Sequence, residues 1–426
     1  MSGTGRPGAP EPGRLERLRT APAWVATLLA TLTVFGPLSM DLYLPVLPDL
    51  ADELGTTASA AQLTMTTCLL GLALGQAVAG PLSDRSGRRA PLLVGVVTYT
   101  AASVLCAAAP AIGALVAARL VQGMAGGVGL VVAQACGRDV YEGSRLSRFY
   151  GRVVVLSGLA AVVAPVLGGA LASVVGWRGF FWLLAAVGAV VTAVVAVGFG
   201  ETLPPGRRIG SGPGELLGQV GVLRRDRVFV GATAASALTS AAYFAYLAGA
   251  PFVLQRVYDL TPGRYALAFG ANAAGFAAAG FLAGRASERW GERRVLAAGL
   301  GVMGAGAGAL VACAAGTAPL GLALTAFFLV ASGAATLSPP ATTLALVAHA
   351  PRAGTASSVV GLARFAAGGV AAPLVGLGGQ ASMTALAVVV AASCAGGTVV
   401  FVWLVRDREP GTGAADPAEE APARSR

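Results

Sequence analysis

The stretch Gly80–Arg89, GPLSDRSGRR, occurs twice in this chain, and its second copy is Gly284–Arg294, GRASERWGERR. The copies lie 204 positions apart, so that Asp84 corresponds to Glu288. Each copy is a short polar segment between two long apolar runs. A repeat at half the chain length that returns to the same side of a membrane needs an even number of spans in each repeat. The pattern therefore predicts a duplicated membrane protein with parallel repeats.

The composition also indicates a membrane protein. Hydrophobic residues make up 55% of the 426 residues and charged residues 12%, and the mean hydropathy is +0.72, unlike soluble globular proteins. A helix needs about 20 apolar residues to span a bilayer. Twelve runs of this kind are present, at about 24–46, 60–82, 90–109, 111–135, 150–175, 179–199, 228–253, 265–286, 295–315, 318–341, 354–376 and 382–405. Backbone groups in lipid must be hydrogen-bonded within the protein, so these runs are predicted to be helices.

The predicted fold class is an all-α polytopic membrane protein that consists of two parallel six-helix repeats. A long segment rich in proline, glycine and arginine between the sixth and seventh runs marks the boundary of the halves. The expected parts are a disordered cytoplasmic tail (1–23), an N-terminal six-helix bundle (24–199), a cytoplasmic linker (200–227), a C-terminal six-helix bundle (228–405) and a second cytoplasmic tail (406–426).

The distribution of charge predicts the topology. All 30 basic residues are arginine, and the net charge is +10. Of these arginines, 25 lie in the two tails and in the loops on their side, three lie in the opposite loops, and Arg119 and Arg364 lie within apolar runs. This asymmetry follows the positive-inside rule, so both termini are expected in the cytoplasm. The basic loops are expected to meet anionic lipid headgroups rather than nucleic acid.

Residue patterns for catalysis, cofactors or metals are missing from the sequence. There is no lysine, which excludes a P-loop ATPase, and His349 is the single histidine. The segment Gly299–Gly304 matches GxGxxG, but it lies in a membrane run and follows no strand. The five cysteines are far apart. We therefore expect no catalytic residues, no metal and no cofactor; a membrane enzyme or receptor is the weakest alternative.

Two ionisable residues inside apolar runs are candidates for a functional site. Asp41 lies near the end of the first run, where a carboxylate costs about 3 kcal/mol to insert, so we expect it to face a cavity. The alternative is an interfacial cap, since Asp49 and Asp52 follow closely. Arg119 shares a helix face with Gln122 and needs an anionic partner or a wet cavity. The alternative for Arg119 is snorkelling towards the membrane surface.

These residues resemble the major facilitator superfamily across Trp24–Val405. The stretch GPLSDRSGRR resembles the superfamily signature between the second and third helices. The segment Arg119–Gly123, RLVQG, resembles the fourth-helix motif of proton-linked members. The segment Pro165–Gly169, PVLGG, resembles the fifth-helix antiporter motif, with Ala164 where a glycine is usual.

Three segments resemble one subfamily, the drug:proton antiporters of the bicyclomycin/chloramphenicol-resistance type, which have twelve transmembrane helices. Asp41–Pro48, DLYLPVLP, is similar to the signature D-x-Y-L-P-x-x-P of this group. Gly137–Tyr141, GRDVY, and Ala353–Ser358, AGTASS, resemble its loops between helices four and five and between helices ten and eleven.

The resemblance implies proton-driven export of a small, largely apolar drug or antibiotic, such as a phenicol, by alternating access. The protein is expected to act as a monomer in the bacterial plasma membrane. A proton-coupled uptake symporter of the same fold is the alternative, although the fifth-helix motif favours export. Asp41 is expected to bind the proton or the positive part of a substrate, and Arg119 is expected to be its partner, so that Arg119→Ala uncouples transport without preventing folding.

Further residues are expected to have roles in transport. The expected substrate cavity includes Tyr43, Gln122, Tyr243, Phe244, Tyr246 and Asn272; packing in the core or against lipid is the alternative for each of the aromatic residues. The expected conformational latch on the cytoplasmic side is formed by Gly80, Asp84, Arg85, Gly87, Arg88, Arg89 and Asp139. The expected antiporter motif of the fifth helix comprises Gly158, Pro165, Gly168 and Gly169.

Overall fold

The computed structural model describes residues 23–141, 143–204, 206, 208, 218, 220–316, 318–377 and 382–406. The two predicted tails, apart from Ala23 and Arg406, lie outside the described residues, as do residues 209–217 of the predicted linker.

Helices form both halves of the described chain. The first half contains α2 (Ala23–Asp41), η1 (Leu44–Val46), α3 (Leu47–Glu53), α4 (Ala58–Ser86), α5 (Arg89–Ala107), α6 (Ile112–Val140) and α7 (Gly143–Gly198). The second half contains α9 (Arg227–Phe252), η3 (Val253–Val257), α10 (Pro262–Trp290), α11 (Glu292–Ala314), α12 (Leu320–Leu346), η4 (Val347–Arg352), α13 (Ala353–Gly376) and α14 (Met383–Leu404). The chain turns within α7 at Gly176, whose φ is 58°, so α7 consists of two helices.

The number of long apolar helices is close to the twelve that the sequence predicts. Within the described residues, ten helices are long and apolar enough to cross a membrane. An eleventh is the bent pair Trp24–Phe35 and Leu38–Glu53, whose axes meet at 47°. The remaining predicted run, 150–175, falls in the first part of α7, where the structure has the shorter apolar helix Val163–Ala172. The all-α polytopic architecture is therefore confirmed.

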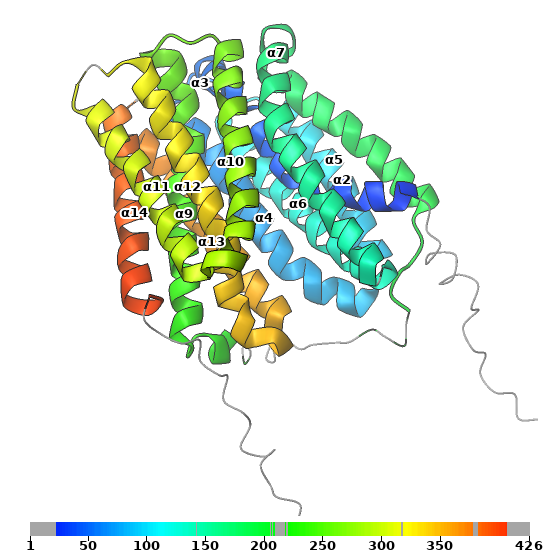
Figure 1. Cartoon of the computed structure of the whole chain (residues 1–426). Helices are drawn as coiled ribbons and strands as arrows, with labels where there is room; N and C mark the ends of the chain where they lie inside the picture. Colours follow the sequence, from blue (N-terminus) through cyan, green and yellow to red (C-terminus); the bar gives the residue numbers. More distant parts are fainter. Residues whose placement is uncertain are drawn as a thin grey trace, which may run out of the picture.

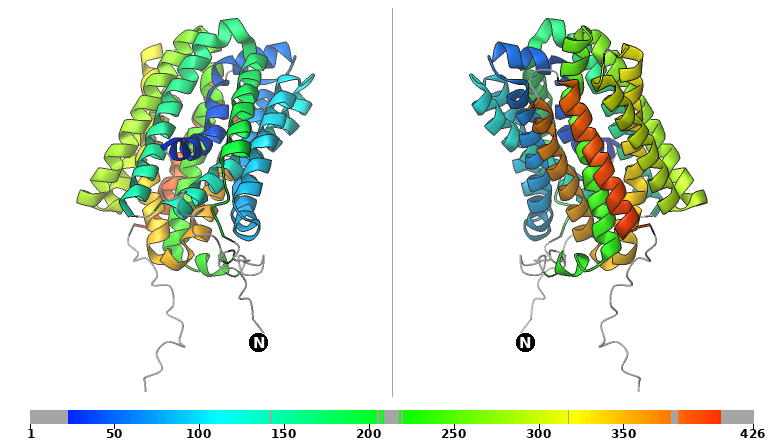
Figure 2. Two further views of the ribbon diagram at one scale, coloured as in Figure 1. Left: turned by 90° about the vertical axis from the view of Figure 1, so that its right-hand side faces the viewer. Right: turned by 90° about the vertical axis from the view of Figure 1, so that its left-hand side faces the viewer.

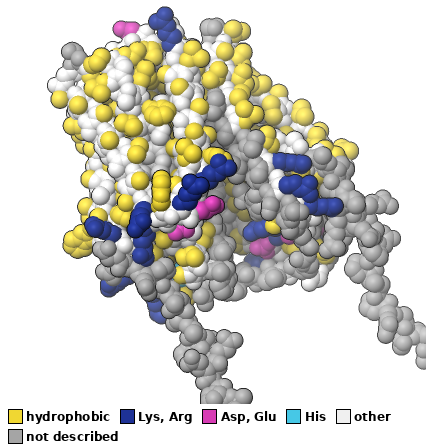
Figure 3. All heavy atoms as spheres, viewed as in Figure 1, with side chains coloured by type: hydrophobic (Ala, Val, Ile, Leu, Met, Phe, Trp, Pro, Cys, Tyr) yellow, Lys and Arg dark blue, Asp and Glu magenta, His cyan; other side chains and the backbone are white. Residues whose placement is uncertain are grey.

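The two halves stand side by side as two bundles (Figures 1 and 2). In the first bundle α4 and α5 pack on α6, and α2 packs on α6 and α7. In the second bundle α9 packs on α12, α13 and α14. The bundles meet where α13 packs on α4 and where α10 packs on α7. Hydrophobic side chains cover much of the outer face in Figure 3, and arginines gather towards its lower end, as a bilayer requires.

Glycines allow the helices of the first bundle to pack closely. A Cβ atom on Gly71 of α4 would lie 2.2 Å from the carbonyl oxygen of Leu120 in α6. A Cβ atom on Gly123 of α6 would lie 2.1 Å from the carbonyl oxygen of Cys68 in α4. The backbones of α4 and α6 are thus in direct contact, which is how small residues stabilise helix pairs in membranes.

Both copies of the repeated stretch end a helix at the same end of the molecule. Gly87 follows α4 with a φ of 91°, and Gly291 follows α10 with a φ of 79°. Both values fall in the left-handed region that favours glycine. Helices α4 and α10 run from the end that carries α3 to the opposite end (Figure 1). We call these the α3 end and the loop-motif end.

The halves are joined by hydrogen bonds at the α3 end. The Nε2 atom of Gln255 in η3 donates to the carbonyl oxygen of Pro45, at 2.8 Å. The guanidinium of Arg256 forms an ion pair with Asp52 of α3, with an N–O distance of 2.5 Å. These contacts connect the two bundles at this end.

Candidate functional site

Asp41 is placed between the two halves. It is the last residue of α2, and it is partly exposed. Its carboxylate forms no hydrogen bond or ion pair with any residue in the described part of the chain. The segment that follows it, η1, packs on α9 and α10 of the other half, the helices that carry Tyr243, Tyr246 and Tyr265. The site therefore combines a carboxylate of one half with tyrosines of the other.

Helix α7 reaches the backbone beside Asp41. A Cβ atom on Gly168 would lie 2.3 Å from the carbonyl oxygen of Leu42, the residue after Asp41. A Cβ atom on Gly169 would lie 2.1 Å from the Cβ of Ala266 in α10. The two glycines therefore bring α7 into contact both with the end of α2 and with the other half. Of the other residues of the expected antiporter motif, Pro165 is buried inside α7, and Gly158 belongs to α7 outside the described side chains.

Arg119 is fully buried in a polar cluster of the first half. Its Nη1 atom donates to Oε1 of Gln122 at 2.6 Å and to the carbonyl oxygen of Ser39 at 3.3 Å. Its Nε atom donates to the carbonyl oxygen of Thr64 at 3.3 Å. Gln122 in turn donates to the hydroxyl of Ser103, at 2.7 Å. Arg119 thereby connects α6 to α2 and α4.

Aromatic rings cover the guanidinium of Arg119. Its central carbon lies 4.7 Å from the ring centre of Tyr43 and 5.5 Å from that of Phe181. The Tyr43 hydroxyl lies 2.9 Å from the hydroxyl oxygen of Thr64. Arg119 and Asp41 are therefore not an ion pair in this structure, because Arg119 is held by neutral groups.

The expected cavity residues fall into two groups. Tyr243 packs against Phe244 and Phe276, with ring centres 5.7 Å and 5.0 Å apart. Asn272 donates to the Tyr246 hydroxyl, at 3.0 Å. These residues form an aromatic cluster in the second half, near Asp41. The other two expected residues, Tyr43 and Gln122, belong to the Arg119 cluster described above.

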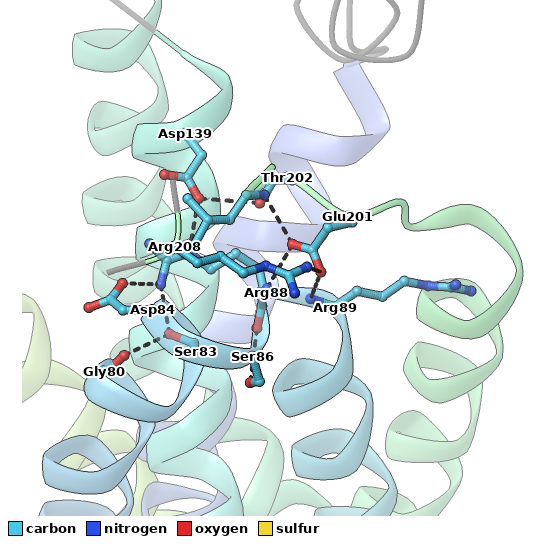
Figure 4. Close-up of polar contacts among 12 residues, drawn as sticks. Gly80, Ser83, Asp84, Ser86, Arg88, Arg89, Asp139, Glu201, Thr202 and Arg208 are labelled. Carbon is cyan, nitrogen blue, oxygen red and sulfur yellow. Dashed lines mark hydrogen bonds and ion pairs between the residues drawn. The ribbon is translucent and has the colours of Figure 1, made fainter. Parts of the chain in front are cut away.

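The expected latch residues come together at the loop-motif end around Arg88 (Figure 4). Its Nη1 atom lies 2.5 Å from Oδ1 of Asp84 and 2.7 Å from the hydroxyl of Ser83. Its Nε atom lies 2.9 Å from Oδ2 of Asp139 at the end of α6. Burial alone would lower the pKa of Arg88, but the hydrogen bonds and charges of Asp139 and Asp84 outweigh burial and hold it above its ordinary value.

Glu201, which the sequence analysis did not assign to the latch, completes this network (Figure 4). Its carboxylate accepts the backbone N–H groups of Arg88, at 2.7 Å, and Arg89, at 3.3 Å, and so caps α5. A Cβ atom on Gly87 would lie 2.4 Å from Oε2 of Glu201. Thr202 donates to Asp139, at 3.3 Å. The sequence feature that could have indicated this role of Glu201 is its position, as an acidic residue just after the sixth apolar run.

The remaining latch residues have smaller visible roles. The carbonyl oxygen of Gly80 accepts the Ser83 hydroxyl, at 3.0 Å, and a Cβ atom on Gly80 would meet no other atom within 4 Å. Arg85 and Arg89 are exposed, and the guanidinium of Arg89 donates to the carbonyl oxygen of Ala196 in α7.

The second copy of the repeat has a different charge at the central position. Glu292 stands where the first copy has Arg88. The hydroxyl of Ser287, which corresponds to Ser83, is buried and has no hydrogen-bond partner among the described residues. The arginine-centred network is therefore a feature of the first half.

Two helical bundles in contact, duplicated loop motifs and a carboxylate between the halves define a polytopic membrane transporter. The family described as Major Facilitator Superfamily matches residues 29–373 and, in a second match, residues 250–426. The chain belongs to this superfamily.

Relatives narrow the class further. A Bacillus subtilis (strain 168) protein named "Uncharacterized MFS-type transporter YdgK" is 33% identical over 90% of this chain and 96% of its own length. The "Chloramphenicol resistance protein" of Pseudomonas aeruginosa is 32% identical over 67% of this chain and 68% of its own. The "Bicyclomycin resistance protein homolog" of Haemophilus influenzae is 27% identical over 82% of this chain and 87% of its own. The resemblance to this group is confirmed: the chain is a transporter and not an enzyme.

Solved structures have the same fold. A bacterial homolog of the human lysosomal transporter Spinster, in an inward-facing and unoccupied conformation, matches with a TM-score of 0.70. It shares 16% sequence identity, over 93% of this chain and 96% of its own length.

Proposed function

We propose that this transporter exports a small, largely apolar drug or antibiotic, such as a phenicol, in exchange for protons. The observation that carries the proposal is the position of Asp41. Its carboxylate has no hydrogen bond or ion pair among the described residues, and it lies just before η1, which packs on α9 and α10 of the other half. Ionisable residues inside membrane helices mark substrate and proton pathways. The named resistance functions of two relatives support a drug as the cargo.

The topology follows from the arginine distribution. Both termini and the loop-motif end face the cytoplasm, and the α3 end faces the outside of a bacterial plasma membrane. The arrangement that we describe is then closed towards the outside by Arg256 and Gln255. The protein acts as a monomer whose basic loops lie among anionic lipid headgroups.

The proton and the substrate compete for Asp41. A neutral, protonated Asp41 no longer attracts the positive part of a substrate, so protonation from the outside releases the cargo outward. Deprotonation towards the cytoplasm restores the binding site. The two bundles rock about the site, which opens to one side of the membrane at a time. The substrate therefore leaves to the outside and the proton leaves to the cytoplasm in separate steps.

The latch residues control the cytoplasmic end of this cycle. The network of Arg88, Asp84 and Asp139 joins α4, α5 and α6 into one rigid unit at the loop-motif end. A rigid end lets the first bundle move as a body, which alternating access requires. Glu201 ties the start of the linker to this unit.

The test is drug susceptibility and efflux in a bacterium that lacks its own drug pumps. The wild type and Asp41→Asn are compared on phenicols and cationic dyes, with and without a protonophore. We expect resistance in the wild type that both the protonophore and Asp41→Asn remove. Resistance that survives Asp41→Asn would assign proton coupling to another group. Proton-driven accumulation of a solute without any resistance would replace export by uptake.

A further inference from the structure

A second arginine within an apolar helix, Arg364 of α13, borders a small cavity in the second half. Its Nε atom donates to the hydroxyl of Ser240 in α9, at 3.1 Å. Neither terminal nitrogen atom of its guanidinium donates to a residue in the described part of the chain. A guanidinium at this depth is costly unless an anionic or accepting group is available to it. Its terminal nitrogens are therefore available for a ligand.

Hydroxyl groups line the same cavity. Its volume is about 60 Å³, and its polar lining residues, apart from Arg364, are Ser236, Thr239, Ser240, Tyr243 and Ser338. Three of these residues share one face of α9, because they are spaced by four and then three positions. None of the described residues that line the cavity is acidic. Cavities that hold a drug-sized ligand measure about 300–1,000 Å³, so this cavity has room for a terminal polar group and not for a whole drug.

Tyr243 connects this cavity to the site of Asp41. It lines the cavity with Arg364. Its ring packs on Phe276 of α10, and α9 and α10 both pack on η1, the segment that follows Asp41. A molecule that extends from the cavity past Tyr243 towards η1 would have the Arg364 guanidinium at one end and the Asp41 carboxylate near the other.

We propose that the Arg364 cavity is a subsite for a planar group with two acceptor oxygens, a carboxylate or a nitro group, at one end of the transported molecule. The planar fork of a guanidinium matches two such oxygens by parallel hydrogen bonds. The surrounding serines add further donors. This inference rests on the proposed export function, and it narrows the substrate class to zwitterions and nitroaromatic compounds with an apolar body.

The test measures binding to the purified protein in lipid nanodiscs by isothermal titration calorimetry. The first probe pair is a fluoroquinolone with a free carboxylate and its methyl ester. The second pair is chloramphenicol and its analogue with the nitro group reduced to an amine. The variants are Arg364→Gln, Arg364→Lys and Ser240→Ala. Arg289→Gln is the control because Arg289 is exposed at the loop-motif end.

We expect the wild type to bind at least one of the two compounds with a carboxylate or nitro group about 10-fold to 100-fold more tightly than the ester or amine analogue of the same pair. Arg364→Gln should abolish this preference without weakening the partner compound, and Arg364→Lys and Ser240→Ala should reduce it. The pair that shows the preference distinguishes a carboxylate from a nitro group. The subsite is overturned by equal binding within both wild-type pairs, by no binding of any probe, or by a preference that survives Arg364→Gln.

These outcomes are distinct from failure of the export function. If Asp41→Asn and the protonophore leave efflux unchanged while Arg364 still sets the binding preference, proton-driven export fails and the subsite stands. If efflux behaves as expected and the preference is missing, only the subsite fails. The wild-type comparison within each pair keeps the test decisive even where a variant does not fold.

Discussion

Arg88 shows how one side chain can hold three helices together. Its side chain is 8% exposed, and it binds carboxylates on α4 and α6 from the start of α5. Hydrogen bonds between charged groups contribute about 1.5–3 kcal/mol each to stability, less where a partner is exposed. We expect Arg88→Gln to lower the free energy of unfolding by about 2 kcal/mol and to reduce drug efflux strongly. Thermal stability of the purified protein and efflux in cells measure the two effects.

The control for Arg88→Gln is Arg289→Gln, which removes the same charge from an exposed position of the second copy. We expect this variant to keep wild-type efflux. Equal losses in both variants would mean that the net positive charge of the loops matters and that the network does not.

Gly87 and Gly291 allow a comparison in which the backbone strain is the same. Both have positive φ values, 91° and 79°, with extended ψ values, a region that only glycine adopts readily, so alanine costs about 1–3 kcal/mol at each. Only at Gly87 would the new Cβ meet the Glu201 carboxylate, at 2.4 Å; at Gly291 it would meet nothing within 4 Å. We expect Gly87→Ala to impair efflux several-fold more than Gly291→Ala, at matched expression. Similar efflux in the two variants would show that Glu201 does not contribute to the latch.

At the scale of helices, the contact of α7 with the end of α2 depends on a glycine, Gly168. A Cβ on Gly168 would lie 2.3 Å from the Leu42 carbonyl oxygen, so Gly168→Ala must push α7 away from the residue next to Asp41. We expect this variant to fold and to lose most proton-coupled efflux. The control is Gly304→Ala in α11, where a Cβ meets nothing within 4 Å. Alanine there is expected to stabilise the helix by about 0.5–1 kcal/mol and to leave transport unchanged.

The sequence predicted the helices and the place of the repeat well, because these depend on local patterns. An apolar run of about 20 residues needs no distant partner to be recognised. The glycines Gly87 and Gly291 turn the chain as the motif predicts. The long helix α7 also fits the prediction of two runs that meet near residue 177, since Gly176 breaks it.

Contacts between distant segments were not predictable from the same patterns. Glu201 reaches Arg88 across 113 positions, and its partner is set by how the sixth span packs on the third. The contacts of Arg119 were not predictable either. Its sequence position suggested pairing with Asp41, but its Nε and Nη1 atoms bind backbone carbonyl groups and Gln122, and its buried Nη2 atom has no hydrogen-bond partner among the described residues. Polar backbone groups carry no sequence signal, so these contacts could not be predicted. Arg119→Ala removes the donor from these acceptors and is therefore also expected to destabilise the first half, by about 1–3 kcal/mol for each acceptor left unpaired.

At the scale of the whole molecule, the two ends differ in how the halves are joined. Contacts at the α3 end cross between the halves, from Gln255 to Pro45 and from Arg256 to Asp52. At the loop-motif end the Arg88 network stays within the first half and the linker. A transporter that alternates must break the first set of contacts once in each cycle. Their strength therefore sets part of the barrier to opening at the α3 end.

Two arginines at the α3 end allow this barrier to be tested. Arg256 of the second half pairs with Asp52 of the first half, whereas Arg178 pairs with Glu53 of its own half. Exposed ion pairs contribute up to about 1 kcal/mol, so Arg256→Gln should raise the open population about two-fold to five-fold. The readout is the labelling rate of Ser59→Cys by a membrane-impermeant maleimide, since the five native cysteines are buried.

We expect Arg178→Gln to leave this labelling rate unchanged, because its pair does not cross between the halves. The Ser59 hydroxyl donates to the carbonyl oxygen of Pro373 in α13, at 3.2 Å, so a label at this position reports separation of α4 from the other half. Faster labelling in both variants would indicate general loosening of the α3 end. No change in either variant would place the barrier in the packing of α13 on α4, where a Cβ on Gly376 would lie 2.4 Å from the Cα of Ser59. In that case the helix contact, and not the ion pair, would hold the α3 end closed.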